Sequence, residues 1–135
     1  MKELTLKATV ENIAAVTAFV DEALEEWACP VKAQLQIDMA VDELFCNIAS
    51  YAYSSGEGDA TVQVDFDASD RTVSLVFMDR GKPFDPLSVD TPDTTSSVED
   101  RRIGGLGIFL VRKTMDGMEY QRDGDVNKLT IRKRI

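Results

Sequence analysis

Two repeating patterns of apolar residues divide the first half of the chain into one strand and two helices. Apolar and polar residues alternate over residues 2–8, which predicts a strand. Apolar residues then recur every three or four positions over residues 11–28 and 31–53, which predicts two amphipathic helices separated by Pro30. The expected buried stripes are Ile13, Val16, Val20, Leu24 and Trp27 in the first helix, and Leu35, Val41, Leu44, Phe45 and Ile48 in the second.

The middle of the chain is predicted to form two strands followed by a long connecting segment. Residues 61–66 alternate between polar and apolar, which predicts a half-buried strand. Residues 72–78 are more continuously apolar, which predicts a strand at the centre of a sheet. Residues 87–103 show no periodicity and contain several Ser, Thr and Asp residues. A segment of that length without its own secondary structure is typical of a functional lid or a disordered loop.

A helix and a hairpin close the chain. The helix is expected from about Leu106 to Met115, the hairpin turn at residues 123–125 and the last strand over residues 126–134. This order of elements favours an α+β two-layer sandwich, with helices on one face of a mostly antiparallel, mixed sheet. Because no repeat or linker divides residues 1–135, we expect a single domain.

The net charge narrows the range of partners. The chain holds 24 acidic and 15 basic residues, a formal charge of −9. An acidic chain is a poor match for nucleic acid or anionic lipid, which require a basic surface, so we expect neither as a partner. The charge is uneven, at −14 over residues 1–100 and +5 over residues 101–135. The sign changes at Arg101 and Arg102, immediately before a cluster of glycines.

Histidine and cysteine usage excludes several kinds of site. The chain has no histidine, which excludes Ser–His and Cys–His nucleophile pairs, His-ligated zinc and phosphohistidine chemistry within these residues. Cys29 and Cys46 form no CxxC pair, which favours two reduced thiols over a disulfide or a metal site. We find no signal peptide and no apolar run of membrane-spanning length, so we expect a cytoplasmic protein.

The second predicted helix carries a carboxylate and an amide four positions apart. Glu43 and Asn47 share one face at the edge of the apolar stripe, whereas Asp42 points toward solvent. An amide oxygen is a suitable ligand for Mg²⁺, and a neighbouring carboxylate can take a proton from a hydroxyl group. The same spacing also fits the solvated flank of an amphipathic helix.

A second motif, Asp79-x-Gly81-x-Pro83-Phe84-Asp85, directly follows the expected central strand. A carboxylate at a strand end can accept a hydrogen bond from an exocyclic amine, and glycine lets a flat ring approach the backbone closely. The alternative is a simple strand-terminating turn, for which Asp, Gly and Pro are all common.

A third motif, Gly104-Gly105-Leu106-Gly107, opens the expected helix after Arg101 and Arg102. Helix N-termini attract phosphate, and glycines let it come close. The motif matches neither the Rossmann nor the P-loop signature. Its other interpretation is a flexible hinge, but the adjoining arginines favour an anion site.

The order and spacing of these three motifs resemble the Bergerat ATP-binding fold, which gyrase, Hsp90, histidine kinases and MutL share. The motifs look like its N box, G1 box and G2 box, and the resemblance covers essentially the whole chain. The short length and the sequence Asp-Arg-Gly-Lys-Pro-Phe-Asp-Pro over residues 79–86 are similar to the bacterial anti-sigma factors with serine kinase activity, the RsbW type.

The resemblance implies roles for the residues at the adenine and metal positions. Asn47 would ligate Mg²⁺ between the phosphates of ATP, and Glu43 would act as the general base. Asp79 would bind the adenine amino group, with Gly81 supporting the ring and Phe84 packing near it.

Further nucleotide contacts are implied at the phosphate end and on the last strands. A lid over residues 87–103 would close over the phosphates, and Thr130 resembles a residue that holds adenine through water. The implied contacts at the phosphate end are Arg101, Arg102, Gly104, Gly105, Leu106 and Gly107.

Two positions depart from the family pattern. Pro83 stands where the G1 box usually has its second glycine, which stiffens the root of the lid. The N box ends in residues 51–53, Tyr-Ala-Tyr, where relatives often have a small residue after histidine. Neither departure removes a magnesium or adenine ligand.

The resemblance implies a Mg-ATP-dependent serine kinase that acts on a STAS-domain anti-sigma antagonist. A sigma factor is a second candidate partner, the acidic body suits a basic protein partner, and a homodimer is expected. The alternatives are a non-catalytic, nucleotide-dependent module that sequesters a sigma factor or other regulator, and a nucleotide-free interaction domain. Glu43 favours the kinase, because a pure binding module would need no base.

Overall fold

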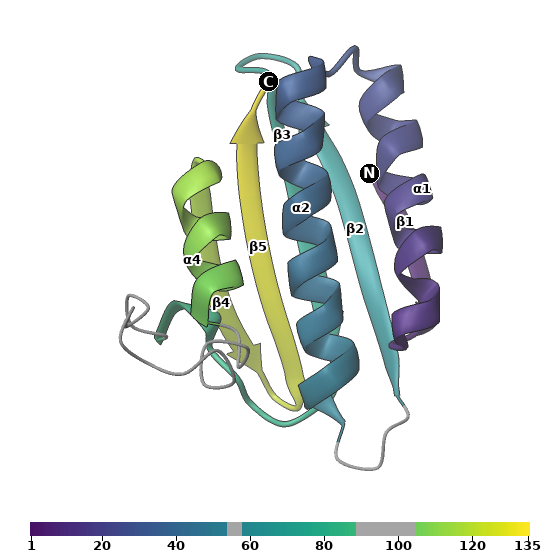
Figure 1. Ribbon diagram of the computed structural model, residues 1–135, viewed down its shortest axis with the longest axis vertical. Coiled ribbons are helices and arrows are strands. Elements are labelled where there is room, and N and C mark those ends of the chain that lie inside the picture. The colour runs from purple at the N-terminus through teal and green to yellow at the C-terminus, as the bar shows by residue number, and fades with distance from the viewer. Residues whose placement is uncertain (54–57, 89–104) are drawn as a thin grey trace.

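The computed structural model describes residues 1–53, 58–88 and 105–135. These residues form one five-stranded sheet in the order β1-β2-β3-β5-β4, with α-helices packed on one of its faces (Figure 1). The strands are β1 (Lys2–Lys7), β2 (Asp59–Asp67), β3 (Thr72–Asp79), β4 (Gly117–Asp123) and β5 (Val126–Arg134). The α-helices are α1 (Ile13–Glu26), α2 (Val31–Asn47) and α4 (Gly105–Thr114).

The expected two-layer α+β sandwich is confirmed, with one adjustment to the sheet. Every pairing between the described strands is antiparallel, so these strands contain no parallel, mixed component. The strand expected at the centre is confirmed as β3, which lies between β2 and β5. Its buried side chains, Val73, Leu75 and Phe77, alternate with half-buried ones, as expected for a strand covered on one face.

The register of β3 and β5 places two polar side chains side by side at one end of the sheet. Asp79, the last residue of β3, lies opposite Asn127 near the start of β5. Asp79 is 7% exposed and Asn127 is 6% exposed, and they are the buried polar residues of the described core. Buried polar groups are costly unless they are hydrogen-bonded, so this end of the sheet is a candidate for function.

The second helix differs from its prediction at its end. A single helix was expected over residues 31–53, but α2 ends at Asn47 and continues as a π-helical segment, Ile48–Ala52. Such π-helical turns often occur at functional sites. The wider turn carries the chain from α2 to the residues that contact the end of β3.

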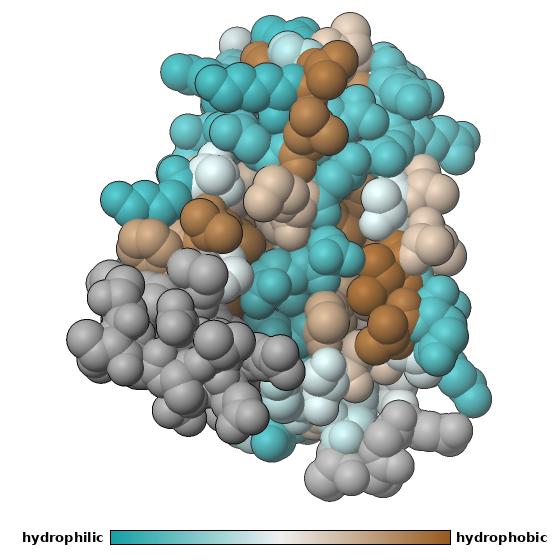
Figure 2. Space-filling view, in the orientation of Figure 1, coloured by the Kyte–Doolittle hydropathy of each residue, from teal (hydrophilic) through white to brown (hydrophobic). Residues whose placement is uncertain are grey.

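One expected core residue of α2 was placed wrongly. Leu35 is 59% exposed and lies with Val31 and Met39 on the ridge opposite the buried Ile37, Val41 and Leu44. Brown, apolar side chains accordingly follow the upper part of α2 on the surface (Figure 2). The remaining residues of both predicted stripes lie in the core or pack against it.

Two further expectations concern the cysteines and the crossing of a membrane. Cys29 and Cys46 are free thiols, as predicted. No helix among the described residues has the length and apolarity needed to cross a membrane. The expected lid lies outside the described residues beyond the short turn Pro86–Ser88.

Candidate functional site

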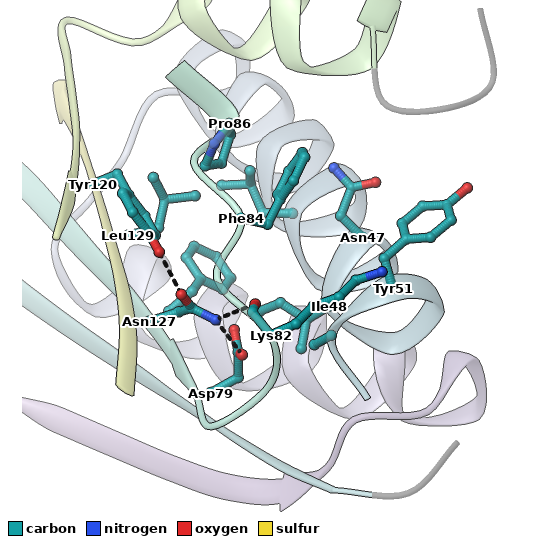
Figure 3. A pocket seen from close by; sticks show the side chains of 13 residues that line it. Asn47, Ile48, Tyr51, Asp79, Lys82, Phe84, Pro86, Tyr120, Asn127 and Leu129 are labelled. Atoms are coloured by element: carbon teal, nitrogen blue, oxygen red, sulfur yellow. Dashed lines mark hydrogen bonds between the residues drawn. The ribbon is translucent and has the colours of Figure 1, made fainter. Parts of the chain in front are cut away.

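A pocket opens where α2, β3 and β5 meet the segment that follows β3 (Figure 3). Its walls are largely apolar, with Leu44 and Ile48 on one side and Phe77 and Leu129 on the sheet. Polar side chains lie at its floor and mouth. Those named in Figure 3 are Asn47, Tyr51, Asp79, Lys82, Tyr120 and Asn127. An apolar slot with few polar groups is typical of a small-molecule site.

Asp79 forms the polar floor of this pocket. Its Oδ1 atom accepts a hydrogen bond of 2.9 Å from the Gly81 backbone N–H and another of 2.9 Å from Asn127 Nδ2. These two donors fix the plane of the carboxylate. Since an ionised carboxylate only accepts hydrogen bonds, its other oxygen, Oδ2, suits an amino group on a ligand.

Gly81 is required because the end of the π-helical segment lies against it. A Cβ atom on Gly81 would overlap the carbonyl group of Ala52. That same carbonyl accepts a 2.8 Å hydrogen bond from the Lys82 N–H, and the Tyr53 hydroxyl accepts one of 2.9 Å from the Arg80 N–H. The unusual Tyr-Ala-Tyr end of the N box therefore fixes the path of the segment beneath the pocket.

Glu43 and Asn47 lie one helical turn apart on α2, as expected. Glu43 is half-buried, and its pKa is raised, first by burial and second by the charge of Asp42. Asp42 is exposed, as predicted. The Nδ2 atom of Asn47 is buried without a hydrogen-bond partner in the described part of the chain, and its side chain lies at the pocket (Figure 3).

The start of α4 approaches Glu43 closely. A Cβ atom on Gly107 would overlap the Glu43 carboxylate, so glycine is needed for this approach. Since α4 begins at Gly105, residues 105–107 form its first turn, where free N–H groups favour an anion. The structure thus brings Glu43 and Gly107 together. Arg101, Arg102 and Gly104 lie outside the described residues.

Phe84 and Thr130 have different positions relative to the pocket. Phe84 lines its mouth and is 41% exposed. Thr130 does not reach it, because alternation along β5 turns Asn127, Leu129 and Ile131 toward the helices and Thr130 toward the uncovered face. There Thr130 lines a separate hollow with Ser74 and Lys128. This position does not fit the expected role of Thr130 beside adenine, whereas Asn127 lies beside Asp79.

The match to a known family agrees with this geometry. Residues 6–133 match the family model described as the histidine kinase-like ATPase domain. The chain belongs to this family. In this chain, Glu43 and Asn47 lie on the helix beside the pocket. Asp79 lies at the floor of the pocket, and Gly107 lies at the start of α4.

Similar proteins carry the names of serine kinases. The chain is similar to the serine/threonine-protein kinase BtrW of Bordetella bronchiseptica, at 29% identity over 96% of this chain and 89% of BtrW. It is also similar to the serine-protein kinase RsbW of Halalkalibacterium halodurans, at 27% identity over 92% of this chain and 77% of that protein. For RsbW of Listeria monocytogenes the identity is 26%, over 90% of this chain and 73% of that protein.

The residues present fit an adenine nucleotide with a divalent cation. Asp79 presents a carboxylate oxygen at the floor of an apolar slot, and Gly107 lets the start of α4 approach the Glu43 carboxylate. The buried Nδ2 atom of Asn47 has no partner among the described residues, an arrangement that a bound phosphate would complete. The amide oxygen of Asn47 is a ligand of the kind that Mg²⁺ prefers.

Four residues of this site were not predicted from the sequence: Asn127, Tyr120, Arg122 and Tyr53. Period-two alternation from the apolar Leu129 and Ile131 places Asn127 on the helix-covered face, and this signal was available in the sequence. The contributions of Tyr120, Arg122 and Tyr53 depend on strand register and on the π-helical segment, which the sequence pattern does not specify.

Proposed function

We propose that this chain is a Mg-ATP-dependent protein kinase that phosphorylates a serine of a STAS-domain anti-sigma antagonist. The observation that carries the proposal is the contact between Glu43 and Gly107. It places a half-buried carboxylate beside a helix N-terminus, next to the pocket that ends at Asp79. Membership of an ATPase family and similarity to proteins named serine kinases support the same reading.

The adenine end of the pocket is built by the sheet and the end of α2. The free edge of Asp79 accepts a hydrogen bond from the adenine amino group, and Gly81, whose N–H group holds the other oxygen of that carboxylate, supports the ring. Ile48, Phe77 and Leu129 bury the faces of the base, and Phe84 covers it from the mouth.

The phosphate end lies toward α4. The N–H groups of the first turn of α4, at residues 105–107, bind phosphate oxygens, and Arg101 and Arg102 are proposed to add positive charge. Asn47 would hold Mg²⁺, which neutralises charge on the phosphates when it is bound.

Glu43 acts on the hydroxyl group of the partner serine. Burial raises the pKa of the Glu43 carboxyl group, which makes its ionised form a stronger acceptor of a proton. Because phosphoryl transfer depends mainly on positioning and charge neutralisation, the remaining task of the chain is to hold the serine oxygen in line with the γ-phosphate.

The partner and the assembly belong to the same proposal. The α1 helix contains Asp21, Glu22, Glu25 and Glu26 and no basic residue, which suits a basic protein partner such as a sigma factor. We further propose that residues 1–135 act as one cytoplasmic domain, as a homodimer.

The substitution Glu43→Gln tests the proposed base. We expect it to lower the transfer of labelled γ-phosphate to serine of a STAS-domain protein from the same genome by at least ~100-fold, because a general base contributes about that factor. The affinity for Mg-ADP should stay unchanged, since the side chain keeps its size. The exposed neighbour Asp42→Asn is the matched control and should keep its rate at pH 8.

The outcomes separate the candidate functions. Undiminished transfer by Glu43→Gln would show that the base is wrongly assigned. A wild-type protein that binds Mg-ADP and transfers no phosphate would instead support the nucleotide-dependent binding module.

A further inference from the structure

The carboxylate of Asp79 is held by a buried polar network that reaches across β5 to β4. The centre of the network is Asn127, whose Nδ2 atom donates to Asp79 Oδ1 at 2.9 Å and to the Lys82 carbonyl oxygen at 2.9 Å (Figure 3). A longer contact of 3.4 Å reaches the carbonyl oxygen of Gly81. All the partners of Nδ2 are acceptors, so this atom of the amide must be the donor.

The other side of the Asn127 amide faces donors. Its Oδ1 atom accepts from the hydroxyl group of Tyr120 and from Arg122 Nη1 at 3.1 Å. A turn of the amide by half a revolution would set its NH₂ group against Arg122 and its oxygen against the Asp79 carboxylate. The partners on both sides therefore permit one orientation only.

Arg122 also connects the network to the segment that follows β3. Its Nη1 atom donates at 2.8 Å to the Gly81 carbonyl oxygen, while its Nε atom donates at 3.1 Å to the Gly124 carbonyl oxygen in the hairpin turn. The hairpin of β4 and β5 thus holds both Asn127 and the glycine beneath the pocket.

The consequence for a ligand lies in which Asp79 oxygen remains available. Oδ1 already accepts two hydrogen bonds, from Gly81 and Asn127, whereas Oδ2 accepts none from the described residues. A fixed carboxylate oxygen accepts a hydrogen bond from an amino group at that point and repels a carbonyl oxygen. A carboxylate free to rotate would discriminate less, because it could turn away from the carbonyl oxygen.

We propose that Asn127, oriented by Tyr120 and Arg122, is a positioning residue that gives the pocket its preference for a 6-amino purine over a 6-oxo purine. The proposal rests on the proposed nucleotide-binding function. It assigns base selectivity to the network that holds Asp79 in addition to Asp79 itself.

The test compares the affinities of Mg-ADP and of Mg-IDP, in which a carbonyl oxygen replaces the 6-amino group. Both are measured by calorimetric titration of the wild type and of two variants. Tyr120→Phe removes one hydroxyl group from the network, and Asn127→Leu removes the donor to Asp79. We expect the ADP-to-IDP affinity ratio to fall about fivefold in Tyr120→Phe and at least ~10-fold in Asn127→Leu, mostly through weaker ADP binding.

A matched control lies on the same strand. Thr130→Val changes a side chain on the uncovered face of β5 and should leave the ratio at its wild-type value. If Asn127→Leu does not fold, the Tyr120→Phe result decides, since that variant keeps the aromatic packing.

Each outcome has one meaning. A ratio that falls in both variants and stays constant in Thr130→Val supports the proposal. Equal losses of ADP and IDP affinity, or an unchanged ratio, would overturn it even though the pocket binds nucleotide. A wild type that binds neither nucleotide would contradict the proposed function itself.

Discussion

At the scale of single residues, the environment of Glu43 sets the pH range of the proposed reaction. Burial raises its pKa, and the charge of the exposed Asp42 raises it further. A general base works in its ionised form, so the rate of transfer at saturating Mg-ATP should rise with pH through the raised pKa and then level off.

The substitution Asp42→Asn tests this cause directly. It removes the second, electrostatic contribution to the raised pKa, so the rise in rate should move to lower pH while the plateau stays the same. The measurement is the pH dependence of kcat for the wild type and the variant. A rise that moves to higher pH would contradict the assignment of Glu43 as the base.

At the scale of elements, the approach of α4 to α2 depends on Gly107. In Gly107→Ala the new methyl group would overlap the Glu43 carboxylate, which is the mobile end of its side chain and can move aside. We expect the variant to fold and its transfer rate to fall by about tenfold, since a small displacement of a catalytic group is costly.

A matched glycine provides the control for this substitution. A Cβ atom on Gly117 would lie 3.5 Å from Arg132 Cβ, an ordinary contact, so Gly117→Ala should keep its rate. Equal rates in wild type and Gly107→Ala, measured with the same labelled-phosphate assay, would argue against the close approach of α4.

A pair of carboxyl groups where α1 packs against α2 makes the free energy of unfolding depend on pH. Burial, a hydrogen bond with Asp21 and the charge of Asp21 raise the pKa of Asp38 from 3.8 to about 7. Between these values the folded chain keeps a proton that the unfolded chain releases, so the free energy of unfolding falls as pH rises from about 4 to 7. Above pH 7 the pair remains destabilising.

Asp38→Asn should remove this contribution. We expect the free energy of unfolding at pH 8 to increase by roughly 1 kcal/mol, a value reduced for solvent screening, and little change at pH 4. Urea denaturation at the two pH values measures it, with the exposed Glu22→Gln as the control. A variant that is less stable than the wild type at pH 8 would contradict this account.

Most of the helices and strands could be predicted from sequence patterns. Alternation predicted β1 and β2, a more continuous apolar run predicted β3, and helical spacing predicted α1 and α2. The prediction that Leu35 is buried was wrong, because an apolar residue on the solvent-exposed ridge of α2 cannot be distinguished from a core residue until the buried face is known. The π-helical segment and the Asn127 network depend on contacts between distant parts of the chain, so the local pattern predicts neither.

At the scale of the whole molecule, the layering brings the site together. The helices cover one face of the sheet (Figure 1), and the pocket lies where that layer meets the ends of β3 and α2. Motifs that are far apart in sequence, around Glu43, Asp79 and Gly107, therefore meet near a single pocket. An acidic chain can bind a polyanion in this way, because local donors and dipoles at the site act more strongly than the net charge.

The affinity of the wild type and of Asp79→Asn for Mg-ADP shows directly whether this pocket is an adenine-nucleotide site. Calorimetric titration should show one saturable site in the wild type and a loss of affinity of at least ~10-fold in Asp79→Asn, because the amide no longer presents a fixed carboxylate to the 6-amino group. Equal affinities in the two proteins, or no binding and no rise in melting temperature of the wild type at millimolar Mg-ADP, would contradict the account.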